Sequence, residues 1–361
     1  MTILWLVLVA VVLAGAQAAF FSRFGLARLT YQRQFSQRLV QEGEEVEMIE
    51  VLTNRKAFWV PWLRIESRMA TGLHFGAQRN LDVTGDLFHT SVFFLMPFSR
   101  VRRRHKVQCL HRGYYPLCSI TMTSGDLLGL HLTGEEMDLD CELLVYPKLL
   151  PKDSLSLPSS KWQGEAVVRR WIQPDPFLVN GIRDYQAGDS LRDVHWAATA
   201  RTGNLQVKTH DFTADPKLWV LLNIQLTGRQ WGEISPDQKE LVEGGLRVAA
   251  TLIDEGLKQG MEVGFATNAM QSGAPREQPV IQPQGAGGQQ WRLLMETLAR
   301  LRLTVRVFMP TFLDEFVSTR PSGQEFVIVT SYWDEALEQR AEALRHMGNE
   351  VHRLPYQGVR V

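Results

Sequence analysis

The spacing of apolar and polar residues divides the chain into three successive patterns. Residues 3–21 (ILWLVLVAVVLAGAQAAFF) form an apolar run without a charged side chain. From Tyr31 to Pro147, short runs of alternating apolar and polar residues are separated by polar turns. After Lys217, continuous apolar runs alternate with segments of helical period. These patterns predict an α+β multidomain protein with an N-terminal transmembrane helix, an antiparallel β-sandwich and an α/β sheet with helices on both faces.

The apolar run Ile3–Phe21 is long enough to cross a bilayer, because about 20 such residues span the hydrocarbon core as a helix. A cleaved signal peptide is the competing interpretation, since Ala16-Gln17-Ala18 resembles a cleavage site, but the positive n-region of such a peptide is missing. Positive charges follow the run instead, at Arg23, Arg28, Arg33 and Arg38. We therefore predict a retained single-pass anchor over residues 1–22, in the inner (cytoplasmic) membrane, with the following domains in the cytoplasm.

A β-sandwich-like domain is predicted over residues 30–150. Short runs of strand character recur there between turn residues, at Val46–Leu52, Trp62–Ser67, Ser91–Leu95, Lys106–Leu110 and Leu143–Tyr146. Regular short strands with polar turns are typical of an antiparallel sandwich. Residues 151–216 follow as a connector whose first part is rich in proline, and this density of proline disfavours helix and regular sheet.

Residues 217–361 are predicted to form the α/β domain. The apolar run Leu218–Leu226 reads as a strand covered on both faces. Ser235 is a candidate N-cap, with Gln238 completing a capping box, and Gly260 ends that helix. The remaining pattern predicts strands and helices in alternation. The predicted strands are Glu262–Ala266, Thr304–Phe308, Phe326–Thr330 and Val351–Leu354, and Ser272–Gly288 is a predicted loop. The predicted helices are Gln289–Leu301 and a second one that is capped by Ser331 and Asp334 and ends near Gly348.

Composition narrows the partners that the chain can take. Lysine and arginine number 39, as do aspartate and glutamate, so no net charge attracts nucleic acid, and we expect no nucleic-acid partner. Cys109, Cys118 and Cys141 have no CxxC spacing and are expected to be small buried apolar residues in a reducing compartment.

The densest group of polar and aromatic residues lies at 183–208 (RDYQAGDSLRDVHWAATARTGNLQVK). Its arginines can pair with its aspartates, and guanidinium–carboxylate pairs are directional enough to fix a loop. Tyr185 and Trp196 are expected to be apolar anchors. A structural clamp that docks the connector onto the α/β sheet explains the group more simply than a binding surface or an acid–base cluster.

A metal-dependent hydrolase is the enzymatic alternative, using Asp189, His195, His210 and Asp211. Their spacing is not HExxH or another tight ligand arrangement, and the chain shows no GxSxG, Ser-His-Asp or Cys-His motif. We therefore predict no catalytic residue, no metal and no cofactor.

Two further segments have features of binding sites. Pro283–Gly288 precedes a predicted helix and could offer N–H groups to an anion, but it lacks the Walker A and GxGxxG patterns and is expected to be a flexible loop. Arg100–Lys106 is a basic run between predicted strands, without interleaved aromatic residues. A solvated strand pair is the simpler interpretation, and contact with lipid headgroups is the better functional one, as in a lipid- or envelope-associated structural protein.

At residues 181–211 the chain resembles the bacterial family known as domain of unknown function fifty-eight. The hallmark series of this family is matched by Arg183, Tyr185, Gly188, Asp189, Arg192, His195, Trp196, Ala200 and Arg201. Arg112-Gly113-Tyr114, Asp126–Gly129 and Val145-Tyr146-Pro147 also resemble its β-module. The resemblance implies an N-terminal membrane segment and a von Willebrand factor A-like C-terminal region. It also implies a role beside a MoxR-type AAA+ ATPase in the assembly or maturation of other proteins.

The chain departs from this family's pattern at two points. Members often have two membrane helices, and here one is predicted. A metal-dependent adhesion site would need Asp-x-Ser-x-Ser after the first α/β strand, where this chain has Asn223, Gln225 and Thr227. Loss of the carboxylate removes the anionic ligand that Mg²⁺ favours. We therefore expect a non-enzymatic, membrane-anchored adaptor that binds protein partners without a bound metal ion.

Overall fold

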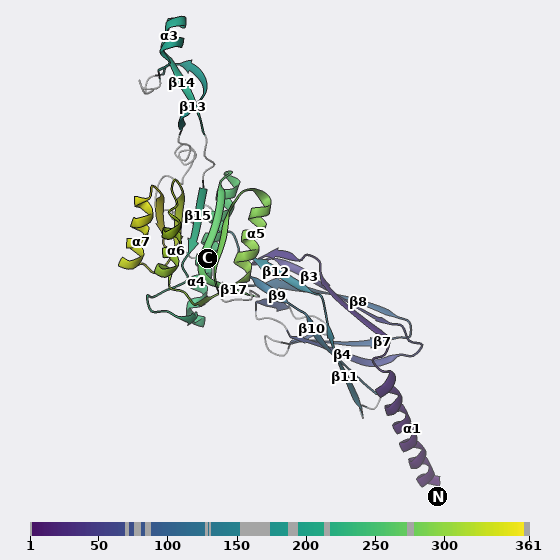
Figure 1. The fold of residues 1–361 in the computed structure, drawn as a ribbon. Helices are drawn as coiled ribbons and strands as arrows, with labels where there is room; N and C mark the ends of the chain where they lie inside the picture. Colours follow the sequence, from purple (N-terminus) through teal and green to yellow (C-terminus); the bar gives the residue numbers. More distant parts are fainter. Residues whose placement is uncertain are drawn as a thin grey trace. The chain divides into compact units, whose positions relative to one another are not determined.

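The computed structural model describes residues 2–68, 72–75, 81–83, 88–126, 129, 131–151, 174–186, 194–212, 217–272 and 278–356 (Figure 1). The chain divides into two compact units. Unit 1 comprises Met1–Lys148 with Met295–Leu301, and unit 2 comprises Leu149–Leu294 with Arg302–Val361. The architecture is a mixed α/β one, with an apolar N-terminal helix, antiparallel β-sheets and a separate α/β sheet.

The first helix, α1, spans Thr2–Phe24. Within Ile3–Phe24, the most apolar 18-residue window has a mean hydropathy of 2.4 and is not buried, so by length and composition this helix is able to cross a membrane. Lys56 reaches the end of the helix, where its Nζ donates to the carbonyl oxygens of Phe24 (3.0 Å) and Gly25 (2.5 Å). These contacts satisfy carbonyl groups that a helix end otherwise leaves unpaired.

The described part of unit 1 contains three sheets. The first has the order β1 (Leu29–Phe35), β3 (Glu45–Asn54), β8 (Arg100–Cys109), β5 (Leu73–Phe75). The second has the order β11 (Leu132–Asp138), β10 (Ser119–Gly125), β4 (Val60–Arg68), β7 (Phe88–Leu95), β6 (Leu81–Val83). Both are antiparallel. The third joins β2 (Leu39–Gln41), β12 (Glu142–Tyr146) and β9 (Gly113–Pro116).

Apolar side chains from the first two sheets share one core, as in a β-sandwich. Tyr31 and Leu52 come from the first sheet, and Leu63, Phe93 and Met122 from the second. The alternation of apolar and polar residues along these strands places one face of each sheet toward this core. The antiparallel, sandwich-like character predicted for this region is therefore confirmed.

Two sequence predictions for unit 1 are wrong. The basic run Arg100–Lys106 does not lie between strands but forms the first part of β8, with exposed and less exposed residues in alternation. Cys118 is exposed, whereas Cys109 and Cys141 are buried. Cys118 directly precedes β10, and its neighbours in the sequence do not distinguish it from a buried cysteine.

Unit 2 begins, in its described part, with the hairpin β13 (Pro174–Asp184) and β14 (Gln206–Phe212), which are joined through helix α3 (Trp196–Thr202). Its main sheet has the order β18 (Pro279–Gly285), β17 (Glu262–Gln271), β15 (Lys217–Leu222), β21 (Glu325–Val329), β22 (Glu350–Leu354). β17, β15, β21 and β22 are parallel, and β18 is an antiparallel edge strand. Three further strands are short: β16 (Gly232–Glu233), β19 (Leu301–Arg302) and β20 (Thr304–Val305). β16 pairs with β20, and β19 pairs with β17.

Helices lie on both faces of this sheet (Figure 1). α6 (Met309–Thr319) and α7 (Glu335–His346) share a core with Leu221 and Phe326 on one face. On the other face, α4 (Pro236–Lys258) lies against β15 and β17, and Gly256 admits the side chains of Leu218 and Val263 to the helix backbone. α5 (Gly287–Arg300) packs beside α4, where the Trp291 Nε1 donates to Asp254.

The α/β region differs from the sequence prediction in five places. β15 ends at Leu222 rather than Leu226, and the strand predicted at 304–308 is limited to Thr304–Val305. The predicted loop Ser272–Gly288 contains β18, and Pro279 and Pro283 are tolerated there because β18 is an edge strand. Helix α6 was not predicted from the sequence, because no polar linker separates it from the preceding strand and because Pro310 follows its first residue. Ser235 is the N-cap of α4, but its side chain makes no capping hydrogen bond.

Two adjacent glycines of α4 predict opposite stability changes. A Cβ at Gly245 would lie 2.9 Å from the buried ring of Tyr356, whereas a Cβ at Gly244 meets no atom within 4 Å. Alanine favours helix by about 1 kcal/mol over glycine. We therefore expect Gly244→Ala to raise the free energy of unfolding by up to about 1 kcal/mol, and Gly245→Ala to lower it by roughly 1–3 kcal/mol through overpacking.

The two variants serve as controls for each other, because they differ by one position in the same helix. Denaturant unfolding of the purified full chain in detergent measures both. Equal changes in the two variants would show that Tyr356 does not restrict this face of α4.

Candidate functional site

The described residues of the motif at 181–211 form one local structure within unit 2. The Tyr185 N–H donates to the Leu205 carbonyl (2.9 Å), and the His195 N–H donates to the Gln206 carbonyl (2.8 Å). His195 is also the N-cap of α3, since its Nδ1 accepts from the Ala198 N–H at 3.0 Å. Backbone pairing and this cap therefore hold β13, α3 and β14 together.

The structure places some of the motif residues and not others. Arg183, Tyr185, His195, Trp196, Ala200 and Arg201 are described; Gly188, Asp189 and Arg192 lie outside the described residues. His210 and Asp211 belong to β14, but their side chains are outside the description. Asp184 accepts a hydrogen bond from the side-chain amide of Gln206, and Arg183 donates to the Asp184 carbonyl at 3.1 Å.

Trp196 is not the buried anchor that the sequence suggested. Its side chain is 69% exposed, and no residue of α3 is buried. Val194 and Val207, which pair in an isolated bridge, are buried in its place. Ile182 and Leu205 of the same motif are also exposed. The motif thus offers large apolar side chains to solvent, which is a property of binding surfaces rather than of cores.

The carboxyl end of β15 carries a network of buried amides, at the positions where the sequence lacks the Asp-x-Ser-x-Ser pattern. The Asn223 Nδ2 donates to the Thr330 hydroxyl (3.0 Å), and its Oδ1 accepts from the Gln225 N–H (3.0 Å). The Asn268 Nδ2 donates to both the Asn223 Oδ1 (3.3 Å) and the Gln225 Oε1 (3.2 Å). The Gln225 Oε1 also accepts from the Met309 N–H at 2.6 Å.

This network occupies the edge at which open parallel sheets bind ligands. Asn223 and Asn268 are fully buried, and Gln225 is 2% exposed. Thr227 contributes its backbone carbonyl, which accepts from the Gln225 side chain at 3.4 Å. The amides satisfy one another with neutral groups, and these residues supply no carboxylate of the kind that Mg²⁺ favours.

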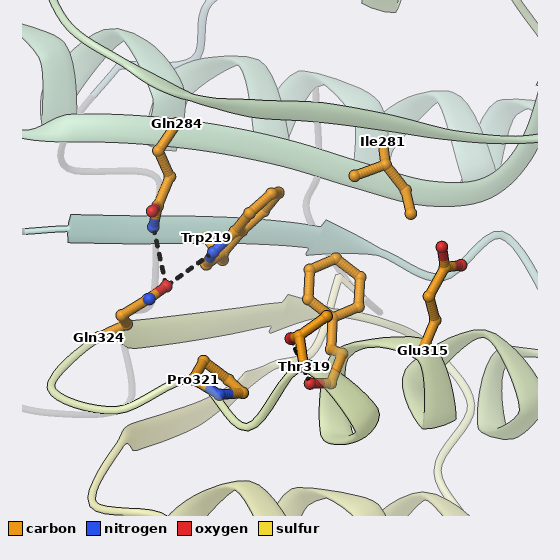
Figure 2. Close-up of a pocket in the computed structure, with 8 residues that line it drawn as sticks. Trp219, Ile281, Gln284, Glu315, Thr319, Pro321 and Gln324 are labelled. Carbon is orange, nitrogen blue, oxygen red and sulfur yellow. Dashed lines mark hydrogen bonds between the residues drawn. The ribbon is translucent and has the colours of Figure 1, made fainter.

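A pocket of about 240 Å³ opens elsewhere in unit 2 (Figure 2). Its walls come from β15, β18, the end of α6 and the segment before β21: Trp219, Ile281, Gln284, Glu315, Phe316, Thr319, Pro321 and Gln324. The Gln324 Oε1 accepts from the Trp219 Nε1 (2.9 Å) and the Gln284 Nε2 (3.2 Å), as the dashed lines in Figure 2 show. Its mainly apolar walls and small volume suit a single side chain better than a drug-sized ligand.

Unit 1 contains a buried charged group that was not predicted. Glu50 is fully buried, and its Oε1 accepts from Tyr31 (2.5 Å) and Arg33 (3.1 Å). Its Oε2 lies 3.2 Å from the Ser91 hydroxyl and 3.0 Å from the His105 Nε2. Polar residues at inward positions of strands, such as His105 in β8, were the available signal in the sequence.

Among the described residues, two groups of three side chains have metal-ligand spacing, and neither includes a motif residue. One combines Glu50, His89 and His105, and the other Glu325, Glu350 and His352. In the first group both oxygens of Glu50 already accept hydrogen bonds, and Arg33 is in direct contact with the carboxylate. A divalent cation there would lie beside a buried positive charge, so the arrangement is that of a structural ion-pair network.

Protonation in this network depends on burial and on the neighbouring donors and charges. Burial would raise the pKa of Glu50, but the hydrogen bond from His105 and the charge of Arg33 outweigh it and lower that pKa well below its ordinary range. His89 is fully buried, and neither ring nitrogen has a hydrogen-bond partner among the described residues. Burial lowers the pKa of His89 to about 4, so His89 is neutral at physiological pH.

Comparison with known proteins identifies one part of the chain. Residues 181–305 match the family model described as "Protein of unknown function DUF58", which confirms the resemblance inferred from the motif. No curated protein sequence matches the chain significantly.

Similar solved structures cover about a third of the chain. The CARDB domain of a Pyrococcus furiosus protein is 14% identical with a TM-score of 0.20, covering 32% of this chain and 94% of that one. A non-cellulosomal cohesin from Archaeoglobus fulgidus is 8% identical with a TM-score of 0.21, covering 32% and 91%. The collagen-binding subdomain of the Enterococcus faecalis surface protein ACE is 9% identical with a TM-score of 0.23, covering 32% and 96%. At these scores the likenesses support no functional argument.

Restoring a carboxylate at the end of β15 is expected to destabilise unit 2. Asn223→Asp removes the donor to Thr330 and introduces a charge among oxygen acceptors, at a cost of roughly 2–4 kcal/mol. Millimolar Mg²⁺ is expected not to restore the lost stability, since Gln225 and Thr227 supply no further carboxylate. Denaturant unfolding with and without Mg²⁺ measures this, with the exposed Asn204→Asp as control. Full recovery with Mg²⁺ would show that a latent metal site exists.

Unit 1 is expected to lose stability in mild acid. Because the folded-state pKa of His89 is about 4 and its ordinary value is 6.5, the unfolded chain binds a proton in this window and the native chain does not. The stability present above pH 6.5 is therefore lost as the pH falls toward 4, and protonation of Glu50 adds to the loss at lower pH.

His89→Leu is expected to remove roughly 2 kcal/mol of this pH dependence, since one pKa unit corresponds to about 1.4 kcal/mol. The measurement is the unfolding midpoint of the full chain at pH 7 and pH 5, with the exposed His74→Leu as control. If His89→Leu retains the dependence of the unmodified chain, the buried imidazole is not its source.

Proposed function

The chain belongs, through residues 181–305, to the DUF58 family, and from this premise we propose that it is a membrane-anchored, non-enzymatic adaptor that binds protein partners. The proposal rests chiefly on the exposure of Trp196, which is 69% accessible at the centre of the family motif. Tryptophan is enriched among the residues that dominate binding energy in protein interfaces. A motif that needed Trp196 only for folding would bury it.

Anchoring is attributed to α1, retained as a single membrane-spanning helix in the inner membrane. The uncharged run of Ile3–Phe21 and the arginines that follow it support this topology. Both units then face the cytoplasm, where a cytoplasmic ATPase would be accessible to them.

The partner we propose is a MoxR-type AAA+ ATPase, with a role in protein maturation or envelope processes. The α/β sheet of unit 2 would act as a von Willebrand factor A-like interaction domain. Its parallel strands and the polar end of β15 support this assignment. Since Asn223, Gln225 and Asn268 close that end with neutral amides, partner binding would not pass through a bound Mg²⁺ ion.

A pull-down from native membranes tests the motif as the binding surface. Trp196→Ala is expected to reduce recovery of the ATPase at least about tenfold, because interface tryptophans commonly contribute 2 kcal/mol or more. Trp231→Ala is the matched control, since Trp231 is also exposed, at 53%, in the same unit. Recovery should be measured across several nucleotide conditions.

Two results would contradict the proposal. One is the recovery of no protein partner with the unmodified chain. The other is an equal loss of recovery in the Trp196 and Trp231 variants, which would indicate a general effect rather than a specific surface.

A further inference from the structure

Two loops of unit 1 are fixed beside the end of α1. The first follows β3 and contains Lys56 and Trp59, and the second joins β7 to β8 and contains Phe98. The buried Asn54 holds the loops together, because its Nδ2 donates to the carbonyls of Phe58 (3.0 Å) and Met96 (2.9 Å). The Phe98 N–H donates to the Lys56 carbonyl at 3.0 Å.

The same loops contact α1 directly. Besides the hydrogen bonds from Lys56 to the carbonyls of Phe24 and Gly25, the rings of Phe58 and Phe20 are 5.0 Å apart. Burial lowers the pKa of Lys56 to about 8, and the ammonium lies 4.9 Å from the Phe58 ring centroid. The loops are therefore placed at the level where α1 ends.

These loops expose unusually large apolar side chains. The exposed fractions are 48% for Trp59, 56% for Met96 and 73% for Phe98. Phe98 also has a φ of 47°, a left-handed conformation that is unfavourable for a bulky residue. Backbone strain combined with an exposed ring indicates that the position serves binding, because a solvated loop would gain from a glycine or asparagine there.

Positive charge gathers at the same end. Arg28, Arg55 and Arg100 are exposed, and the Arg55 N–H donates to the Arg28 carbonyl at 3.3 Å. Farther along β8, Lys106 and Arg104 form ion pairs with Glu45 and Glu47 of β3. Toward the loop, β3 places Val51 opposite Arg102 and Thr53 opposite Arg100, so the carboxylates are replaced by uncharged residues.

We propose that Trp59, Met96, Phe98, Arg55 and Arg100 form a membrane-proximal surface that inserts into the headgroup region of an anionic bilayer beside α1. Aromatic rings are favoured at this depth, and arginines pair with anionic headgroups. The occupant follows from the position of the surface at the end of the apolar helix and from its charge. This inference rests on the proposed membrane anchoring, and it adds a second lipid contact that orients unit 1 on the membrane.

The native Cys118 provides a matched control position for a test. β10 runs from Ser119 to Gly125, and the Gln17 side chain of α1 donates to Asp126, directly after this strand, at 3.1 Å. Cys118 precedes the other end of β10, about 20 Å away along the strand. It is exposed, whereas Cys109 and Cys141 are buried and less accessible to a thiol reagent.

The experiment uses the full chain in phosphatidylethanolamine–phosphatidylglycerol vesicles, with an environment-sensitive dye on one cysteine. The dye is placed at Phe98→Cys or Trp59→Cys, each in a Cys118→Ser background, or on the native Cys118. We expect blue-shifted emission at positions 98 and 59, with several-fold stronger quenching by headgroup-proximal spin-labelled lipid than at Cys118. Replacing phosphatidylglycerol with phosphatidylcholine should weaken this quenching.

Dyes at 98 and 59 that are quenched by aqueous iodide as strongly as at Cys118 would overturn the inference. So would dyes shielded from both lipid and iodide, since a second copy or a protein partner would then cover the surface. Flotation of the vesicles at alkaline pH tests the anchor separately. A chain that does not float refutes the anchoring itself, whereas a floating chain with solvent-exposed dyes refutes only the second lipid contact.

Discussion

Glu50 is a fully buried carboxylate inside a β-sandwich, and unit 1 can retain its charge there only while its hydrogen-bond donors remain in place. Tyr31 and Arg33 come from β1, His105 from β8 and Ser91 from β7, so the interaction joins strands of both sheets. Removing one partner would leave an uncompensated buried charge, which is far more costly than any single surface contact. The packing of the two sheets against each other therefore depends on the protonation state of Glu50.

The end of α1 depends on a similar requirement. Its terminal carbonyls need donors, and the Lys56 ammonium supplies them from a loop of the sandwich. Asn54 connects this loop to the loop between β7 and β8. Helix α1 and the β-sandwich are therefore joined by a defined structure rather than by a free linker. A helix joined in this way transmits its position to the domain that follows it.

The sequence predicted the features that depend on local periodicity. The apolar run of α1, the strands of the sandwich and most of the alternation in unit 2 follow from side-chain spacing, and the motif at 181–211 identified the family. The sequence did not reveal α6, which follows a short strand without a polar linker, or β18, whose prolines suggested a loop. It suggested an anchor role for Trp196, whose side chain is exposed, because hydrophobicity alone does not distinguish an anchor from a contact residue. The partners of Glu50 come from strands distant in the sequence, so no local pattern could have grouped them.

The amide network at Asn223 has a consequence for regulation. Asparagine, glutamine and threonine side chains carry no proton that titrates near neutral pH, and none of them supplies a carboxylate to a divalent ion. The hydrogen bonds of this network are therefore insensitive to acidity near neutral pH. Under the proposed function, a change of acidity that alters partner binding would have to act at another place, and the solvent-exposed helix α3 and its hairpin offer such a surface.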